Sequence, residues 1–163
     1  MSEDSEIKPE DKKIHGLTTD EYRELVNKYR DALEYVEGIG PVYGEKLKAI
    51  GILTPLDLLN KGRFRKGREE LAEQSGISHK LILDWVNHID LYRLNGVDAD
   101  YAELLVKAGV DSVMELAQRN PVNLHAKITE VNQEKNVART TPNLEEVQAW
   151  IERAKVLPRV IQY

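Results

Sequence analysis

A run of apolar residues and glycines between residues 33 and 51 recurs 58 positions later without a gap. The first copy contains Leu33, Val36, Gly38, Ile39, Gly40, Gly44, Leu47 and Gly51, and the second contains Leu91, Leu94, Gly96, Val97, Asp98, Ala102, Leu105 and Gly109. The match continues to Leu58 and Leu116 and includes Tyr43 with Tyr101. Self-similarity of this length predicts a duplicated unit, in which each copy is a helix, a tight glycine turn and a second helix.

Apolar residues recur at helical spacing through most of the chain, and no segment alternates as a β-strand would. We predict an all-α fold, a compact bundle of short helices forming a single domain over residues 17–163 after a charged, disordered tail over 1–16. Repeat 1 is expected at about 33–60 and repeat 2 at about 91–118. Capping and glycine signals predict helices from about 19 to 36, Pro41 to Gly51, Thr54 to Leu59, Glu69 to Gln74 and His79 to Leu94, with two more after Asn120 and Pro142.

The net charge of −5 is unevenly distributed along the chain. Residues 38–68 contain seven basic and two acidic side chains, a net charge of +5, whereas the equivalent residues 96–126 contain two basic and five acidic ones, a net charge of −3. Five of the basic side chains lie in the segment KGRFRKGREE, which begins at Lys61. Its two glycines and its charge predict an exposed loop that leads into a helix at Glu69. The copies therefore share an apolar pattern but differ in surface charge.

Composition gives no sign of export, membrane insertion or a bound cofactor. The chain has no cysteine, its N-terminus lacks an apolar signal sequence, and no segment approaches the roughly 18 apolar residues of a membrane span. A soluble, cytoplasmic protein is expected. The four histidines lack zinc-site spacing, and Asp98, Asp100 and Glu103 lack the glycine and distal glutamate of a calcium loop. No metal and no cofactor are therefore expected.

Residues 33–47 satisfy the spacing h-x-x-h-x-G-h-G-x-x-x-[small]-x-x-h, where h is apolar, which is typical of the helix-hairpin-helix motif. Over about residues 33–156 the chain resembles an uncharacterised prokaryotic family of tandem helix-hairpin-helix domains. The resemblance rests on GIGPVYGEKLKAIGI, EELAEQSGIS and DLYRLNGVDADYAELLVKAGVDSVMELAQRNP, and on Pro142, Leu144, Val147 and Trp150. It implies a SAM-like all-α architecture and no assigned activity. Similarity to the wider helix-hairpin-helix superfamily implies sequence-independent binding of the DNA backbone.

The first turn is the copy in which such binding is expected. Glycine permits a positive φ and close backbone approach, and the backbone amides of Gly38, Ile39 and Gly40 are expected to bind a phosphate. The basic side chains expected to extend the contact are Lys46, Lys48, Lys61, Arg63, Arg65, Lys66 and Arg68. In the second copy Asp98 replaces the last glycine and Asp100 follows, so two carboxylates would lie where a phosphate approaches. That copy is not expected to bind DNA by itself.

Two other classes of function stay open beside weak, non-specific nucleic-acid binding. In a protein-interaction scaffold, the basic copy would contact an acidic protein partner, or the acidic copy of a second molecule in salt-sensitive self-association. In a lyase, a lysine such as Lys46 would act as a Schiff-base nucleophile, which requires a lowered pKa in a pocket. The sequence contains no Ser-His-Asp arrangement and no phosphate-loop signature, so we expect no enzymatic activity.

Overall fold

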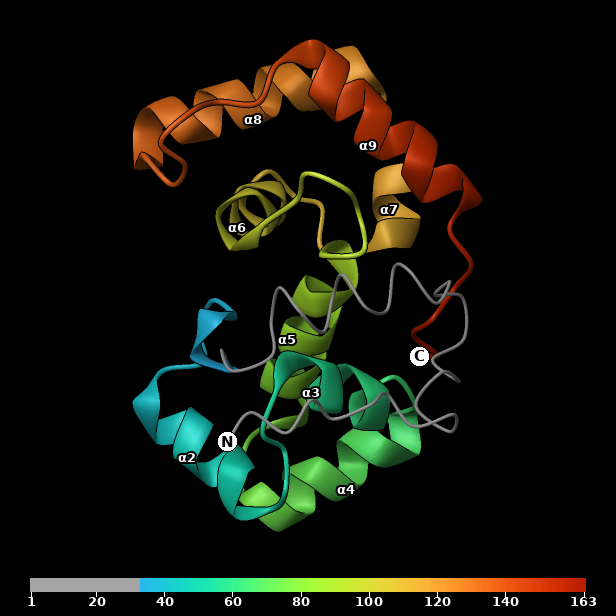
Figure 1. Ribbon diagram of the computed structural model, residues 1–163. Coiled ribbons are helices and arrows are strands. Elements are labelled where there is room, and N and C mark those ends of the chain that lie inside the picture. Colours follow the sequence, from blue (N-terminus) through green and yellow to red (C-terminus); the bar gives the residue numbers. More distant parts are fainter. Residues whose placement is uncertain (1–32) are drawn as a thin grey trace, which may run out of the picture.

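The computed structural model describes residues 33–163, so the predicted tail over 1–16 and most of the predicted helix over 19–36 lie outside the described residues. Within this part of the chain every regular element is a helix, which confirms the all-α prediction. The elements are the 3-10 helix η2 (Leu33–Tyr35) and the α-helices α2 (Pro41–Ala49), α3 (Pro55–Gly62), α4 (Arg65–Ser75), α5 (His79–Leu91), α6 (Ala99–Lys107), α7 (Val113–Ala117), α8 (Pro121–Lys135) and α9 (Leu144–Val156) (Figure 1).

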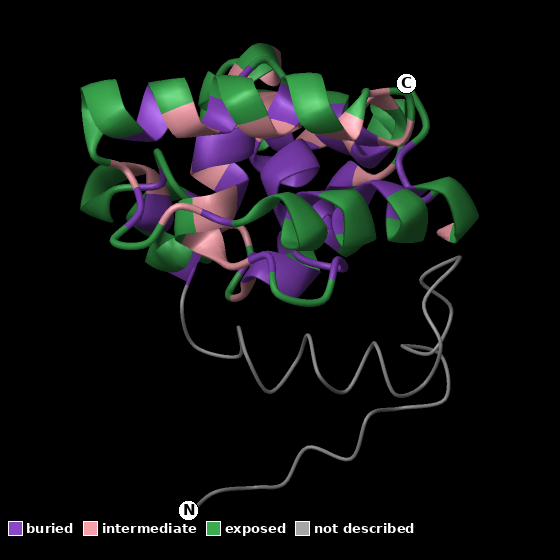
Figure 2. Ribbon diagram, turned by 90° about the horizontal axis from the view of Figure 1, so that it is seen from above, coloured by how far each residue is buried: buried purple, intermediate pink, exposed green. Residues whose placement is uncertain are grey.

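Helix α5 lies between two groups of helices and contacts both (Figure 1). It packs against α3 and α4 on one side and against α6 and α7 on the other, while α9 packs against α7 and α8. Buried residues line the inner faces of the helices and exposed residues cover their outer faces (Figure 2). The buried apolar side chains form one cluster that includes residues of both repeats, so neither repeat has a core of its own.

The two predicted repeats have matching elements. Helices α2 and α6 both contain nine residues and begin 58 positions apart, at Pro41 and Ala99, and α3 and α7 also begin 58 positions apart. A glycine with positive φ stands on each side of α2 and of α6, and these four φ values lie between 85° and 93°. Only glycine adopts this backbone conformation without strain, which is why the glycine spacing predicted the turns. The four residues are Gly38, Gly51, Gly96 and Gly109.

The two repeats also correspond in a helix that follows each of them, a pair that the repeat at 58 positions did not reveal. Helices α5 and α9 both contain 13 residues, and each has a tryptophan at its seventh position, Trp85 and Trp150. The Trp85 ring lies 5.3 Å from the ring of Tyr43, and the Trp150 ring lies 5.4 Å from the ring of Tyr101. Trp85 therefore packs on α2, and Trp150 packs on α6. Because α5 and α9 are 65 rather than 58 positions apart, a search at one fixed offset misses them.

The prediction of an exposed basic loop that starts at Lys61 and leads into a helix at Glu69 is wrong. Helix α3 continues to Gly62 instead of ending at Leu59, and α4 begins at Arg65 instead of Glu69, so only two residues separate them. Gly67 is buried where α4 crosses the end of α3, and a Cβ atom there would overlap the carbonyl oxygen of Lys61. The glycines in this segment therefore allow two helices to approach closely and do not mark a flexible loop.

Helix α5 ends at Leu91 and not at the predicted Leu94. The amides of Tyr92, Arg93 and Leu94 bond to carbonyl oxygens three residues back, at distances of 3.1–3.2 Å, so the chain tightens into a turn before Gly96. The last two predicted helices begin where proline and asparagine caps indicated, at Pro121 and Leu144.

Residues 157–163 return from α9 to the first group of helices (Figure 1). The amide of Gln162 donates to the carbonyl oxygen of Arg63 at 2.8 Å, and the Tyr163 hydroxyl donates to Oδ1 of Asn87 at 2.8 Å. Val160 and Ile161, which precede Gln162 and Tyr163, are buried. The C-terminal segment thus connects the second repeat to the α3–α4 junction of the first.

Candidate functional site

The first glycine turn places the start of α2 at the surface. Gly38 has a φ of +89°, and the amide of Ile39 donates to the carbonyl oxygen of Val36 at 3.0 Å. The Ile39 side chain is buried in the core. The prediction that Ile39 donates its amide to a phosphate is therefore wrong, because that amide already has an acceptor. The buried side chain of Ile39 instead anchors the turn to the core.

The amides of Gly40, Val42 and Tyr43 at the start of α2 have no acceptor among residues 33–163. Gly40 is the N-cap residue and has no side chain to accept a hydrogen bond, and Pro41 has no N–H. The amides of Val42 and Tyr43 are consequently left without a partner in this part of the chain. No heavy atom of residues 33–163 lies within 4 Å of where a Cβ atom of Gly40 would stand, so the described part of the chain leaves the approach to this helix end open.

In the second copy the same position is filled. Asp98 stands at the place of Gly40 as the N-cap of α6, and its Oδ1 accepts a hydrogen bond from the amide of Tyr101 at 2.9 Å. Tyr101 is the counterpart of Tyr43. A carboxylate thus occupies the position in the second hairpin that an anion could take in the first.

The two lysines of α2 differ in their surroundings. Lys46 is exposed and has no ion pair within the described residues; it follows Val42 by four positions and so shares its helix face. Lys48 donates from Nζ to Oε1 of Glu34 at 2.6 Å, and this hydrogen bond is the main reason that the pKa of Glu34 is lowered. Both partners of that pair are exposed, so it contributes little stability and can be broken by a competing anion.

The remaining predicted basic residues lie away from the turn. In Figure 1 the start of α2 is at the left edge of the molecule, whereas the α3–α4 junction is on the right, beside the C-terminal end. Lys61 pairs with Glu70 at 2.6 Å and Arg65 with Glu69 at 3.1 Å. The structure therefore does not bring the basic segment and the first hairpin together on one side.

The side chains at this junction differ in exposure. The Arg63 guanidinium stacks over the Phe64 ring at 4.5 Å, and burial lowers the pKa of Arg63. Lys66 is exposed and has no ion pair with the residues described.

Arg68 was predicted to contact a nucleic acid, and this prediction is wrong. Its side chain is buried, with 1% of the residue exposed. Nη1 donates to the carbonyl oxygens of Gly62 at 2.9 Å and Arg63 at 3.3 Å, and Nη2 donates to that of Gln162 at 2.9 Å. Burial lowers the pKa of Arg68, but a guanidinium stays protonated at neutral pH. Arg68 thus joins α3, α4 and the C-terminal segment.

A comparison with known protein families adds an identification to this geometry. The family model described as a domain of unknown function, DUF4332, matches residues 37–157, which include both glycine turns, helices α2 and α6 and both tryptophan helices. The chain belongs to this family. Comparisons with curated proteins and with solved structures gave no match.

The sequence predicted donors at residues 38–40 of this DUF4332 domain and so missed the open amides of Val42 and Tyr43, although the predicted donor Gly40 also has no acceptor among residues 33–163. The signal that could have identified them is the pair of N-cap residues, because glycine and aspartate at equivalent positions predict an uncapped and a capped helix. Within residues 33–163 of the domain, histidine and acidic side chains form no group of three or more that could hold a metal ion. No helix in that range is long and apolar enough to cross a bilayer.

Proposed function

We propose that this DUF4332 domain consists of two tandem helix-hairpin-helix units and that the first unit binds the nucleic-acid backbone without sequence preference. One observation carries the proposal: the start of α2 has open amides at Val42 and Tyr43, whereas the start of α6 is capped by Asp98. Because the backbone is extended at both N-cap residues, the difference in capping between α2 and α6 comes from the residue type at this one position. The second hairpin then acts as a structural partner of the first.

The chemistry of the first helix end suits a phosphate group. Unpaired amides and the partial positive charge of a helix N-terminus favour an anion, and phosphate oxygens accept hydrogen bonds from such amides. Gly40 leaves space for the anion to approach, and Val42 is 68% exposed beside it. Lys46 on the same helix face adds attraction to a neighbouring phosphate.

The same geometry makes binding weak and independent of sequence. Backbone amides and lysines that contact phosphates fix the position of a protein on nucleic acid but do not distinguish base pairs. Few cations surround the turn, since Lys48 must leave Glu34 before it can contribute. Contact with two or three phosphates predicts a log–log salt dependence with a slope of about −2 to −3.

Fluorescence anisotropy with a labelled DNA duplex at several salt concentrations tests the proposal. The wild-type chain is expected to bind with micromolar affinity at low salt, and Gly40→Asp, which copies Asp98, is expected to abolish binding. Lys46→Gln should reduce the magnitude of the salt slope by about 1. Lys66→Gln is the matched control, because it removes one exposed positive charge far from the turn and should leave affinity nearly unchanged.

Equal binding by the wild type and Gly40→Asp would overturn the assignment of the site. No binding even at low salt would overturn nucleic-acid binding altogether. Sedimentation of the unlabelled chain at low and high salt then tests the alternative scaffold, which requires self-association that weakens with salt.

A further inference from the structure

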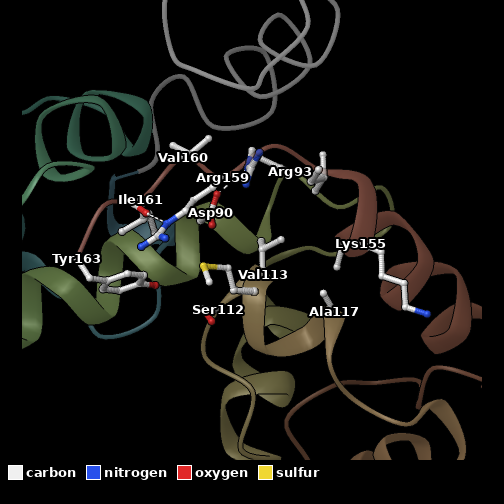
Figure 3. A pocket seen from close by; sticks show the side chains of 13 residues that line it. Asp90, Arg93, Ser112, Val113, Ala117, Lys155, Arg159, Val160, Ile161 and Tyr163 are labelled. Atoms are coloured by element: carbon white, nitrogen blue, oxygen red, sulfur yellow. Dashed lines mark hydrogen bonds and ion pairs between the residues drawn. The ribbon is translucent and has the colours of Figure 1, made fainter.

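A pocket of about 210 Å³ lies between α5, α7, α9 and the C-terminal segment (Figure 3). Part of its wall is apolar and comes from Val113, Ala117, Ala154 and Val160. Apolar cavities of about 150 Å³ in proteins hold a molecule the size of benzene. This pocket is therefore large enough for one aromatic ring or a branched aliphatic group with a small polar substituent.

Two of the charged side chains at the pocket neutralise each other. Asp90 and Arg93 are both buried, and Nε of Arg93 donates to Oδ1 of Asp90 at 2.6 Å. Nη1 of Arg93 also donates to the carbonyl oxygen of Pro158 at 2.9 Å. A third charged residue, Lys155, pairs with Glu152 at 3.2 Å, and in Figure 3 its amine points away from the other labelled side chains.

Arg159 is the charged lining residue that forms no ion pair with another side chain among the described residues. Its Nε donates to the carbonyl oxygen of Ile161 at 2.9 Å, and its guanidinium lies 5.5 Å from the centre of the Tyr163 ring. The Ile161 carbonyl and the Tyr163 ring are both uncharged at neutral pH. In Figure 3 Arg159 lies on the same side of the pocket as Asp90 and Ile161, with Ala117 across from it. The lining therefore combines an apolar wall with one positive charge.

We propose that this pocket binds a small monocarboxylate with an apolar body, whose carboxylate contacts Arg159 and whose body packs against Val113, Ala117 and Ala154. A guanidinium can donate two parallel hydrogen bonds to a carboxylate. Binding of the apolar body would also bury the apolar wall of the pocket away from water, which is favourable. The ligand would hold residues 157–163 against α7. Helix α2 does not line the pocket, so this site is independent of the proposed nucleic-acid site.

Benzoate is the first probe, with benzylamine and benzyl alcohol as cationic and neutral molecules of similar shape. In ¹H–¹⁵N spectra of the labelled chain, benzoate is expected to shift the signals of pocket residues with a dissociation constant on the order of 1 mM, typical of so small a ligand. Benzylamine should bind at least about tenfold more weakly, because its charge is repelled by Arg159.

Two variants test the two parts of the site. Arg159→Gln removes the positive charge, and Ala117→Phe fills the pocket; both are expected to abolish the benzoate shifts. Arg139→Gln is the control, because it removes an exposed charge between α8 and α9 and should leave benzoate binding intact. Unchanged benzoate binding in Arg159→Gln, equal binding of benzylamine, or no shifts at millimolar benzoate would each overturn the proposal. Arg159→Gln keeps the test decisive if Ala117→Phe does not fold.

Discussion

The carboxylate of Asp98 accepts a hydrogen bond from the backbone amide of Tyr101 at 2.9 Å. In the first hairpin, Gly40 and Tyr43 occupy the equivalent positions, and the amide of Tyr43 has no acceptor among the described residues. The starts of the two helices therefore differ at one residue position. The start of α6 carries its own carboxylate, whereas the start of α2 is open to an external anion.

Gly40→Asp is predicted to stabilise the fold while it removes binding. Gly40 has a φ of −78°, which any residue adopts, and a Cβ atom there meets no neighbour within 4 Å among the residues that the structure describes. A carboxylate at this N-cap should raise the free energy of unfolding by a few tenths of a kcal/mol up to about 1 kcal/mol. Urea denaturation measures the change, and Asp98→Gly should shift stability the opposite way. A destabilised Gly40→Asp variant would contradict this prediction and would show that the fold requires glycine at position 40.

Arg68→Ala is predicted to destabilise the chain by at least about 3 kcal/mol, because three carbonyl oxygens lose a buried donor and a cavity remains. Arg65→Ala removes an exposed guanidinium from the same helix and should change stability by less than about 0.5 kcal/mol. Urea denaturation of both variants checks the contrast. Similar small effects would contradict a structural role for Arg68.

The different surroundings of Arg68 and Arg65 show which features of the structure could not be predicted from the sequence. The all-α fold, the glycine turns and the correspondence of α2 with α6 were predictable, because a positive φ and a repeated apolar pattern depend on local sequence. Arg68 was counted as a surface charge, since its burial depends on Gln162, which lies 94 positions away. The segment around it was predicted as a loop because Gly67 serves close helix packing, and glycine also favours loops.

Gly67→Ala tests the close crossing of α3 and α4. On an isolated helix this change would stabilise by up to about 1 kcal/mol, because alanine is the better helix former. Here the added Cβ would overlap the backbone carbonyl oxygen of Lys61, which cannot move without shifting α3. We expect a net loss of stability of about 1–3 kcal/mol by urea denaturation. Lys66→Ala, at a neighbouring exposed position, should have nearly no effect, and a more stable Gly67→Ala variant would refute the crossing.

His88 predicts a pH dependence of stability. Burial lowers the pKa of His88, despite opposing effects of the Asp84 carbonyl and of the carboxylates of Asp84, Glu103 and Asp111. Its Nε2 is buried without a hydrogen-bond partner among the residues described. The unfolded chain therefore binds a proton below about pH 6.5 while folded His88 stays neutral, so the free energy of unfolding falls as pH decreases from 6.5 toward the folded pKa.

The size of this effect is limited to about 1.4 kcal/mol per pH unit for one group. Urea denaturation at about pH 7.5 and about pH 5.5 measures it, and subtracting the same difference in His88→Leu removes the contribution of other titrating groups. The wild type should lose more stability than His88→Leu on acidification. Equal losses would contradict a lowered pKa at His88.

The most direct measurement of the central claim is chemical-shift mapping of the ¹⁵N-labelled chain with a short DNA duplex at low salt. We predict that the amide signals of Val42 and Tyr43 shift and that the amide signal of Tyr101, already bonded to Asp98, does not. The two tyrosine amides occupy matched positions in one molecule, so each serves as a control for the other. Shifts at Tyr101 equal to those at Tyr43, or shifts confined to other surfaces, would contradict the first hairpin as the phosphate site.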